Sequence, residues 1–161
     1  MKKKILITDR FSFESQVYLE REGPFEIVRT KNPKDLPLDQ LISAHALLIR
    51  SKTPITAELF EKARNLQVVV SMTSGFDHID LRAAQKWGVT IMHTPWAHRE
   101  SAAQLTWGLV MACCSKIVQG HEQVHALEWA RESLKGFELQ GRTYGILGLG
   151  KIGSRVAEIA Q

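Results

Sequence analysis

Cysteine is scarce in this chain of 161 residues, which has only two, and they are neighbours: Cys113 and Cys114. In a helix two adjacent side chains diverge by about 100°, so a disulfide between them would be strained. We therefore expect both to be buried, reduced thiols. The chain also lacks a secretory signal, because Asp9 and Arg10 end the apolar run that begins at Ile5. A cytoplasmic protein is the expectation.

Two further absences exclude classes of partner. Basic residues give a net charge of +4, but they are scattered and do not alternate with aromatic residues, which form only 7% of the chain. Nucleic acid is therefore not an expected partner. The apolar segment 102–118 is similar to a short membrane span, yet Gln104, Thr106 and Ser115 interrupt it and its flanks show no charge asymmetry. A helix packed against another helix is expected there, and no membrane partner.

Short apolar runs alternate with helical patterns in the first part of the chain. The expected strands are residues 4–8, 25–29, 46–50, 68–71 and 89–92, and the expected helices are residues 14–21, 56–64 and 79–87. A loop with two prolines is expected over residues 32–37. Continuous apolar strands of this length suit a parallel sheet covered by helices on both faces. The expectation is an α/β fold, with a flavodoxin-like doubly wound parallel sheet as a substrate domain over residues 1–93.

Residues 94–161 have a different pattern, dominated by helices. We expect a long helix over residues 100–121 that ends near Gly120, and a shorter helix over residues 122–131. A strand over residues 143–147 should follow. These elements would form a connector and the first βα unit of a second, truncated domain.

A glycine turn follows the last expected strand. Gly148, Gly150 and Gly153 have the spacing of the dinucleotide-binding fingerprint, and a helix is expected directly after them. The first-turn amides of that helix would face the cofactor phosphates. We therefore expect the start of a Rossmann domain that binds NAD or NADP. The acidic residue that separates these cofactors is expected about 20 residues further on, so the choice stays open.

Two loops are candidates for binding an anion, because ligands of doubly wound sheets bind at the carboxyl ends of the strands. Arg50 and Ser51 follow the third expected strand and offer a cation and a hydroxyl group. Ser74 and Gly75 follow the fourth, where backbone amides can meet a carboxylate or a phosphate. A structural interpretation stays open beside this one, in which Arg50 pairs with an acidic neighbour and the second loop only starts a helix.

These segments, taken in order, resemble the D-isomer-specific 2-hydroxyacid dehydrogenases, and most strongly the branch that contains phosphoglycerate dehydrogenase. The matching segments are residues 50–53, 73–80, 94–95, 101–104 and 141–153. The resemblance implies an NAD(P)-dependent oxidoreductase of two domains, which interconverts a small D-2-hydroxy acid and a 2-keto acid by hydride transfer. It also implies a homodimer.

The resemblance implies binding roles for particular residues. Those for the substrate are Arg50, Ser51, Ser74, Gly75 and His98, and those for the cofactor are Ser101, Gln104, Gly148, Gly150, Lys151, Ile152 and Gly153. The family commonly has Glu at the position of Gln104 and often Asn at that of His98, so contacts there differ. His98 either selects an anionic substrate or is an exposed loop histidine.

No catalytic residue is implied within these 161 residues. The family's arginine, acidic residue and histidine correspond to positions beyond residue 161. A positioned acid and an electrostatic clamp each contribute factors of about 100 or more. We therefore predict that this chain alone is inactive.

Two other functions stay open. The chain could be a non-catalytic module that binds small acids. It also contains a match to the zinc-hydrolase pattern H-E-x-x-H, formed by His121, Glu122 and His125. No downstream histidine completes the longer form of that pattern, so exposed histidines on a connector helix are the main interpretation and no metal is expected.

Overall fold

The computed structural model of the protein describes residues 2–30 and 36–161. These form two compact units, with the boundary between Ala97 and His98. The boundary expected from the sequence was between residues 93 and 94. Most of the two-proline loop expected over residues 32–37 lies outside the described residues.

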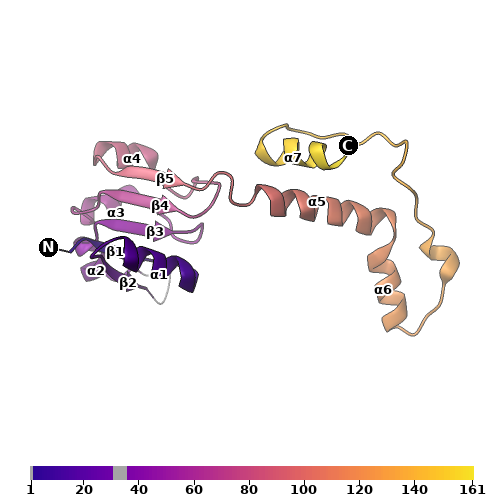
Figure 1. Ribbon diagram of the computed structural model, residues 1–161, viewed down its shortest axis with the longest axis horizontal. Coiled ribbons are helices and arrows are strands. Elements are labelled where there is room, and N and C mark those ends of the chain that lie inside the picture. The colour runs from indigo at the N-terminus through magenta and orange to yellow at the C-terminus, as the bar shows by residue number, and fades with distance from the viewer. Residues whose placement is uncertain (1, 31–35) are drawn as a thin grey trace. The chain divides into compact units, whose positions relative to one another are not determined.

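A parallel sheet forms the centre of the first unit (Figure 1). Its strands are β1 (Lys4–Ile7), β2 (Glu26–Arg29), β3 (Ala46–Ile49), β4 (Val68–Ser71) and β5 (Thr90–His93). They lie in the order β2-β1-β3-β4-β5, and every neighbouring pair is parallel. This is the flavodoxin-like strand order of doubly wound folds, so the predicted fold class is confirmed.

Four helices connect these strands: α1 (Phe13–Glu22), α2 (Leu38–Ser43), α3 (Ala57–Lys62) and α4 (Leu81–Lys86). Ser12, Thr56 and Asp80 cap α1, α3 and α4, because each side chain accepts a hydrogen bond from a first-turn amide. The helix expected from residue 79 therefore begins later, after the Asp80 cap. Ile79 is instead buried and pairs with Ile55 in an isolated parallel bridge.

The two faces of the sheet bury separate cores, because successive strand residues point to opposite faces. Leu47 belongs to the core on the face covered by α2, α3 and α4, together with Phe60 of α3. Its neighbour Leu48 belongs to the core on the other face, where Leu19 of α1 packs. Helices thus cover both faces, as the apolar strands predicted.

Helices make up most of the regular structure in the second unit. They are α5 (Arg99–Cys114), α6 (Ile117–His125), the 3-10 helix η1 (Arg131–Leu134) and α7 (Lys151–Ile159). The single long helix expected over residues 100–121 is wrong, because the chain breaks between α5 and α6 at Lys116, which has a φ of 56°. A distant segment contributes to this break, since the Phe137 amide donates to the Cys114 carbonyl at the end of α5 (3.0 Å). Gly120, the expected break, lies inside α6.

The strand expected over residues 143–147 is not formed. A strand requires a hydrogen-bonded neighbour, and no other strand of the described second unit lies beside this segment. The glycine turn and α7 do follow it. Val156 of α7 is buried, and its carbonyl accepts a hydrogen bond from the indole nitrogen of Trp107 on α5 (3.0 Å).

The two cysteines lie at the end of α5 and neither forms a disulfide. Cys114 is buried, but Cys113 is exposed, so the expectation of two buried thiols is wrong for Cys113. Side chains of adjacent helical residues point in different directions, which places only one of them against the neighbouring segment. Among the described residues no single helix is long and apolar enough to cross a membrane, and α5 and α6 meet that test only as a pair bent by 63°.

Truncation of Phe60 tests the larger core. Phe60 is 1% exposed, so Phe60→Ala should lower the free energy of unfolding by about 3–5 kcal/mol through lost burial and a new cavity. The matched control is Phe13→Ala on α1, where the ring is 76% exposed and the expected change is below about 0.5 kcal/mol. Urea denaturation followed by circular dichroism measures both, and equal changes would contradict this description of the core.

Candidate functional site

The turn after β3 carries Arg50 and Ser51 at the carboxyl edge of the sheet. The Thr53 amide donates to the Arg50 carbonyl (3.3 Å), which closes the turn. The buried Thr53 hydroxyl lies 2.8 Å from the hydroxyl of Thr8, the residue that follows β1. Ser51 is exposed and Arg50 is partly exposed. Nothing in the described part of the chain forms an ion pair or side-chain hydrogen bond with Arg50, so the structural interpretation of an ion-paired Arg50 finds no support.

The loop after β4 carries Ser74 and Gly75, and a chain of polar groups supports it from within. The buried Ser71 hydroxyl lies 2.7 Å from the Thr73 hydroxyl and 3.3 Å from Nε2 of His78. The Thr73 hydroxyl donates to the Gly75 carbonyl (2.8 Å). The hydrogen bond to the Gly75 carbonyl restrains the orientation of the peptide group that contains this carbonyl.

A second histidine, His93, supports the same loop from β5. Its Nδ1 lies 3.0 Å from the Ser74 carbonyl, and its ring packs edge-on against Phe76 with centroids 5.1 Å apart. No role for His93 is expected from the sequence alone. The signal that could have found it is strand register, because His93 is the partner of Ser71 across the β4 and β5 pair.

The turn after β3 and the loop after β4 are joined to each other. Ile55 donates its amide to the His78 carbonyl and accepts from the Asp80 amide, both at 2.9 Å. This is the parallel bridge between Ile55 and Ile79, beyond the ends of the strands. The structure therefore places four of the predicted substrate residues, Arg50, Ser51, Ser74 and Gly75, on two connected loops at one edge of the sheet.

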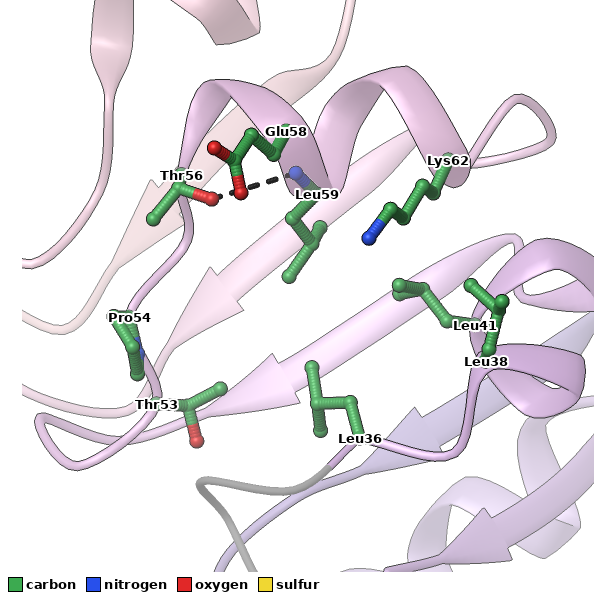
Figure 2. Close-up of a pocket in the computed structure, with 9 residues that line it drawn as sticks. All are labelled: Leu36, Leu38, Leu41, Thr53, Pro54, Thr56, Glu58, Leu59 and Lys62. Atoms are coloured by element: carbon green, nitrogen blue, oxygen red, sulfur yellow. Dashed lines mark hydrogen bonds between the residues drawn. The ribbon is translucent and has the colours of Figure 1, made fainter.

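A pocket of about 260 Å³ opens between α2 and α3 (Figure 2). Leucines line it, with Glu58 and Lys62 of α3 beside them, and Thr53 and Pro54 from the turn after β3 complete one wall. The Thr56 hydroxyl that caps α3 also belongs to this lining. The pocket shares Thr53 and Pro54 with the turn after β3, but none of the predicted site residues lines it.

The remaining predicted substrate residue, His98, opens the second unit as the residue before α5. Its carbonyl accepts from the Ser101 hydroxyl (3.3 Å) and from the Ala102 amide (3.0 Å), as in the first turn of a helix. Its ring makes no capping hydrogen bond and His98 is exposed. Gln104, one turn further on, donates from its side-chain amide to Glu100 (3.3 Å). Ser101 and Gln104 therefore lie at the start of α5, as expected.

Ion pairs join the start of α5 to α7. Arg155 binds Glu100 through two hydrogen bonds, from Nε (2.7 Å) and Nη2 (3.1 Å), and also binds Glu158 (3.0 Å). Arg99 binds Glu158 (2.8 Å) and donates to the Lys151 carbonyl (3.0 Å). The hydrogen bonds from Arg155 lower the pKa of the Glu100 carboxyl, and the same contacts raise the pKa of Arg155. Sequence reasoning missed this network because it joins residues far apart in the chain.

The three glycines before α7 differ in what surrounds them. Gly148 has a φ of 95°, which only glycine adopts without strain. A Cβ on Gly153 would meet the Gly148 carbonyl oxygen at 2.0 Å, whereas a Cβ on Gly150 would meet nothing within 4 Å. The helix itself begins without a side-chain cap. This arrangement fits a dinucleotide, because a pyrophosphate needs close backbone approach at the second glycine and amides at the helix start.

The zinc-hydrolase pattern lies on α6. His121 and His125 are close together, with ring centroids 4.3 Å apart. Across residues 2–30 and 36–161, no group of three or more His, Cys, Asp or Glu side chains could hold a metal ion. A catalytic zinc site needs three protein ligands, so the structure offers no support for a zinc hydrolase.

Comparison with known proteins identifies relatives over almost the whole chain. The family model described as D-isomer specific 2-hydroxyacid dehydrogenase, catalytic domain, matches residues 5–154. The D-3-phosphoglycerate dehydrogenase of Methanocaldococcus jannaschii is 36% identical over 158 residues, which are 98% of this chain and 30% of that protein. The hydroxypyruvate reductase of Thermotoga maritima is 31% identical over 157 residues, 98% of this chain and 51% of that protein.

A solved structure gives the same result. The D-lactate dehydrogenase from Aquifex aeolicus, complexed with NAD and lactic acid, superposes with a TM-score of 0.84 at 27% identity. The match covers 96% of this chain and 47% of the other. The chain thus spans about a third to a half of the length of these relatives.

Removal of the Thr73 hydroxyl tests the support of the loop after β4. Thr73→Val deletes the contacts with Ser71 and Gly75, so the free energy of unfolding should fall by about 1–2 kcal/mol. The control is Thr90→Val on β5, where the exposed side chain should contribute less than about 0.5 kcal/mol. Urea denaturation compares the two variants, and an unchanged midpoint for Thr73→Val would show that the hydroxyl chain does not support the loop.

Alanine at the third glycine tests the turn before α7. Gly153→Ala forces the new Cβ against the Gly148 carbonyl, so the amides of α7 should exchange with solvent about tenfold faster or more. Gly150→Ala is the matched control, because its Cβ meets no atom of the chain within 4 Å and the effect should be smaller. Hydrogen exchange followed by mass spectrometry resolves α7. Equal exchange in both variants would refute the tight contact at Gly153.

Proposed function

The chain belongs to the D-isomer-specific 2-hydroxyacid dehydrogenase family, and we propose that it is the N-terminal portion of an NAD(P)-dependent enzyme that interconverts a D-2-hydroxy acid and a 2-keto acid. The observation that carries this proposal is the supported loop after β4, joined to the turn that carries Arg50. A 2-keto acid has a carboxylate, to which the loop offers backbone amides, while the turn offers a cation and a hydroxyl group to the other end of the acid.

In the first unit, the amides of Ser74 and Gly75 bind the substrate carboxylate. The peptide group of the Gly75 amide is oriented by His93, which contacts the Ser74 carbonyl, and that of the Ser74 amide by the Thr94 amide, which donates to the Thr73 carbonyl (3.1 Å). Arg50 and Ser51 contact the distal end of the substrate. His98, exposed at the start of the second unit, is the candidate for selecting an anionic distal group.

In the second unit, the cofactor-binding residues are Ser101 and Gln104 on α5, and Gly148, Gly150, Lys151, Ile152 and Gly153 at and before the start of α7. A bound nicotinamide cofactor supplies the hydride, and these residues hold it in position. The open space at Gly150 admits the pyrophosphate, and the first turn of α7, from Lys151 to Gly153, offers amides to it. Relatives of known structure have been solved with NAD or with NADP, so the proposal leaves this choice open.

The family's catalytic arginine, acidic residue and histidine are proposed to belong to the part of the enzyme outside residues 1–161. Residues 1–161 alone then bind ligand without turnover. The intact enzyme is proposed to be a cytoplasmic homodimer that uses neither nucleic acid nor a membrane. A non-catalytic module that binds small acids is the second candidate, because four of the residues proposed to bind the acid, Arg50, Ser51, Ser74 and Gly75, lie within the first unit.

Loss of the Arg50 charge tests the proposal in the full-length protein that contains this chain. Oxidation of NADH or NADPH is followed at 340 nm with pyruvate and with hydroxypyruvate. Arg50→Gln should raise KM for hydroxypyruvate about tenfold or more, since its distal hydroxyl accepts a charged hydrogen bond that contributes about 1.5–3 kcal/mol, and should leave kcat nearly unchanged. Lys52→Gln removes a neighbouring exposed cation from the same turn and is the matched control.

Turnover and ligand binding, both measured on the same full-length protein, separate the two candidate functions. Turnover of a 2-keto acid supports the dehydrogenase. Tight binding of these acids with no turnover and no cofactor binding supports the acid-binding module instead. An equal rise in KM for Arg50→Gln and Lys52→Gln would contradict the specific role given to Arg50.

A further inference from the structure

One face of α6 carries two imidazole side chains that the proposed dehydrogenase does not use. His121 and His125 are four residues apart, and His125 is the last residue of the helix. Both are exposed. Residues four apart share one face of a helix, and here the ring centroids lie 4.3 Å apart with an angle of 64° between the ring planes.

This separation is close to that of two imidazoles on one metal ion. With nitrogen to metal distances of about 2.1 Å, two rings bound at right angles have centroids roughly 4.6 Å apart. The observed 4.3 Å therefore places the two rings at about the spacing that a shared ion requires. Because both side chains are exposed, an ion can reach them from solvent.

The ligand set restricts which ion fits. In the described part of the chain no third His, Cys, Asp or Glu joins the pair, so the remaining coordination positions belong to water. Zinc in structural and catalytic sites has three or four protein ligands. Two imidazoles with water oxygens in the remaining positions suit the tetragonal geometry of Cu²⁺ and Ni²⁺, and affinity among divalent first-row ions is highest for Cu²⁺.

We propose that His121 and His125 form a binding site for a divalent first-row transition metal ion, with Cu²⁺ held more tightly than Ni²⁺ or Zn²⁺. The ion links two successive turns at the end of α6. Directly after this end the chain leaves the helix, and Leu127 has a φ of 55°. Because an ion that binds only the folded helix stabilises it, occupancy should strengthen the last turn of α6.

Titration of the 161-residue chain with Cu²⁺, in the presence of glycine as a competing ligand, tests the site. A chelating pair should bind about 100-fold more tightly than a single histidine, because the second imidazole binds intramolecularly. His121→Ala and His125→Ala should each bind Cu²⁺ about 100-fold more weakly than the original chain. Electron paramagnetic resonance should show two imidazole nitrogens on the tight-binding copper, and nuclear magnetic resonance should show broadening centred on residues 117–125.

Two controls separate a paired site from binding to any surface histidine. His98→Ala removes an exposed histidine elsewhere in the same unit and should leave the tight Cu²⁺ affinity unchanged. The double variant Gln123→His with His125→Ala keeps the number of histidines but places the pair two residues apart, on different faces of the helix. Its Cu²⁺ affinity should fall to that of a single histidine. If this double variant binds as tightly as the original chain, or if broadening centres outside α6, the proposal is wrong.

Discussion

Parallel pairing of β3, β4 and β5 is the constraint on which the candidate site in the first unit depends. Strands that run in one direction end at one edge of the sheet, so their following loops meet there. Pairing continues past the strand ends, because the Met72 amide donates to the Ile49 carbonyl and the Thr94 amide to the Thr73 carbonyl. The loops are thus extensions of the sheet. Their peptide groups are oriented before any ligand arrives, which lowers the ordering cost of binding.

In the second unit the equivalent constraint is the packing of α7 against α5. A helix of nine residues is too short to be stable in isolation, so its order comes from tertiary contacts. The Val156 side chain is buried, and the Trp107 indole nitrogen donates a hydrogen bond to the Val156 carbonyl. The ion pairs around Arg155 connect the exposed sides of both helices. The glycine turn precedes this helix directly. Its shape therefore depends on α5, which precedes it by many residues in the sequence.

The two units differ in how they present ligand chemistry. The first offers polar groups from separate loops, supported by a chain of hydroxyl and imidazole contacts that ends at the Gly75 carbonyl. The second offers mainly backbone, in a turn where one glycine is crowded and another is open. The proposed function relates both to one reaction. The histidine pair on α6 lies on a helix that exists as a separate element only because the chain breaks at Lys116.

By itself the sequence determined the five parallel strands, the glycine turn and the family. Apolar runs and glycine spacing are local properties, and they need no knowledge of distant residues. Only the tertiary structure decided the break after α5, the missing strand over residues 143–147 and the position of His93 opposite Ser71. Each of these depends on a hydrogen-bonding partner, present or absent, that lies far away in the chain, and local pattern carries no information about such partners.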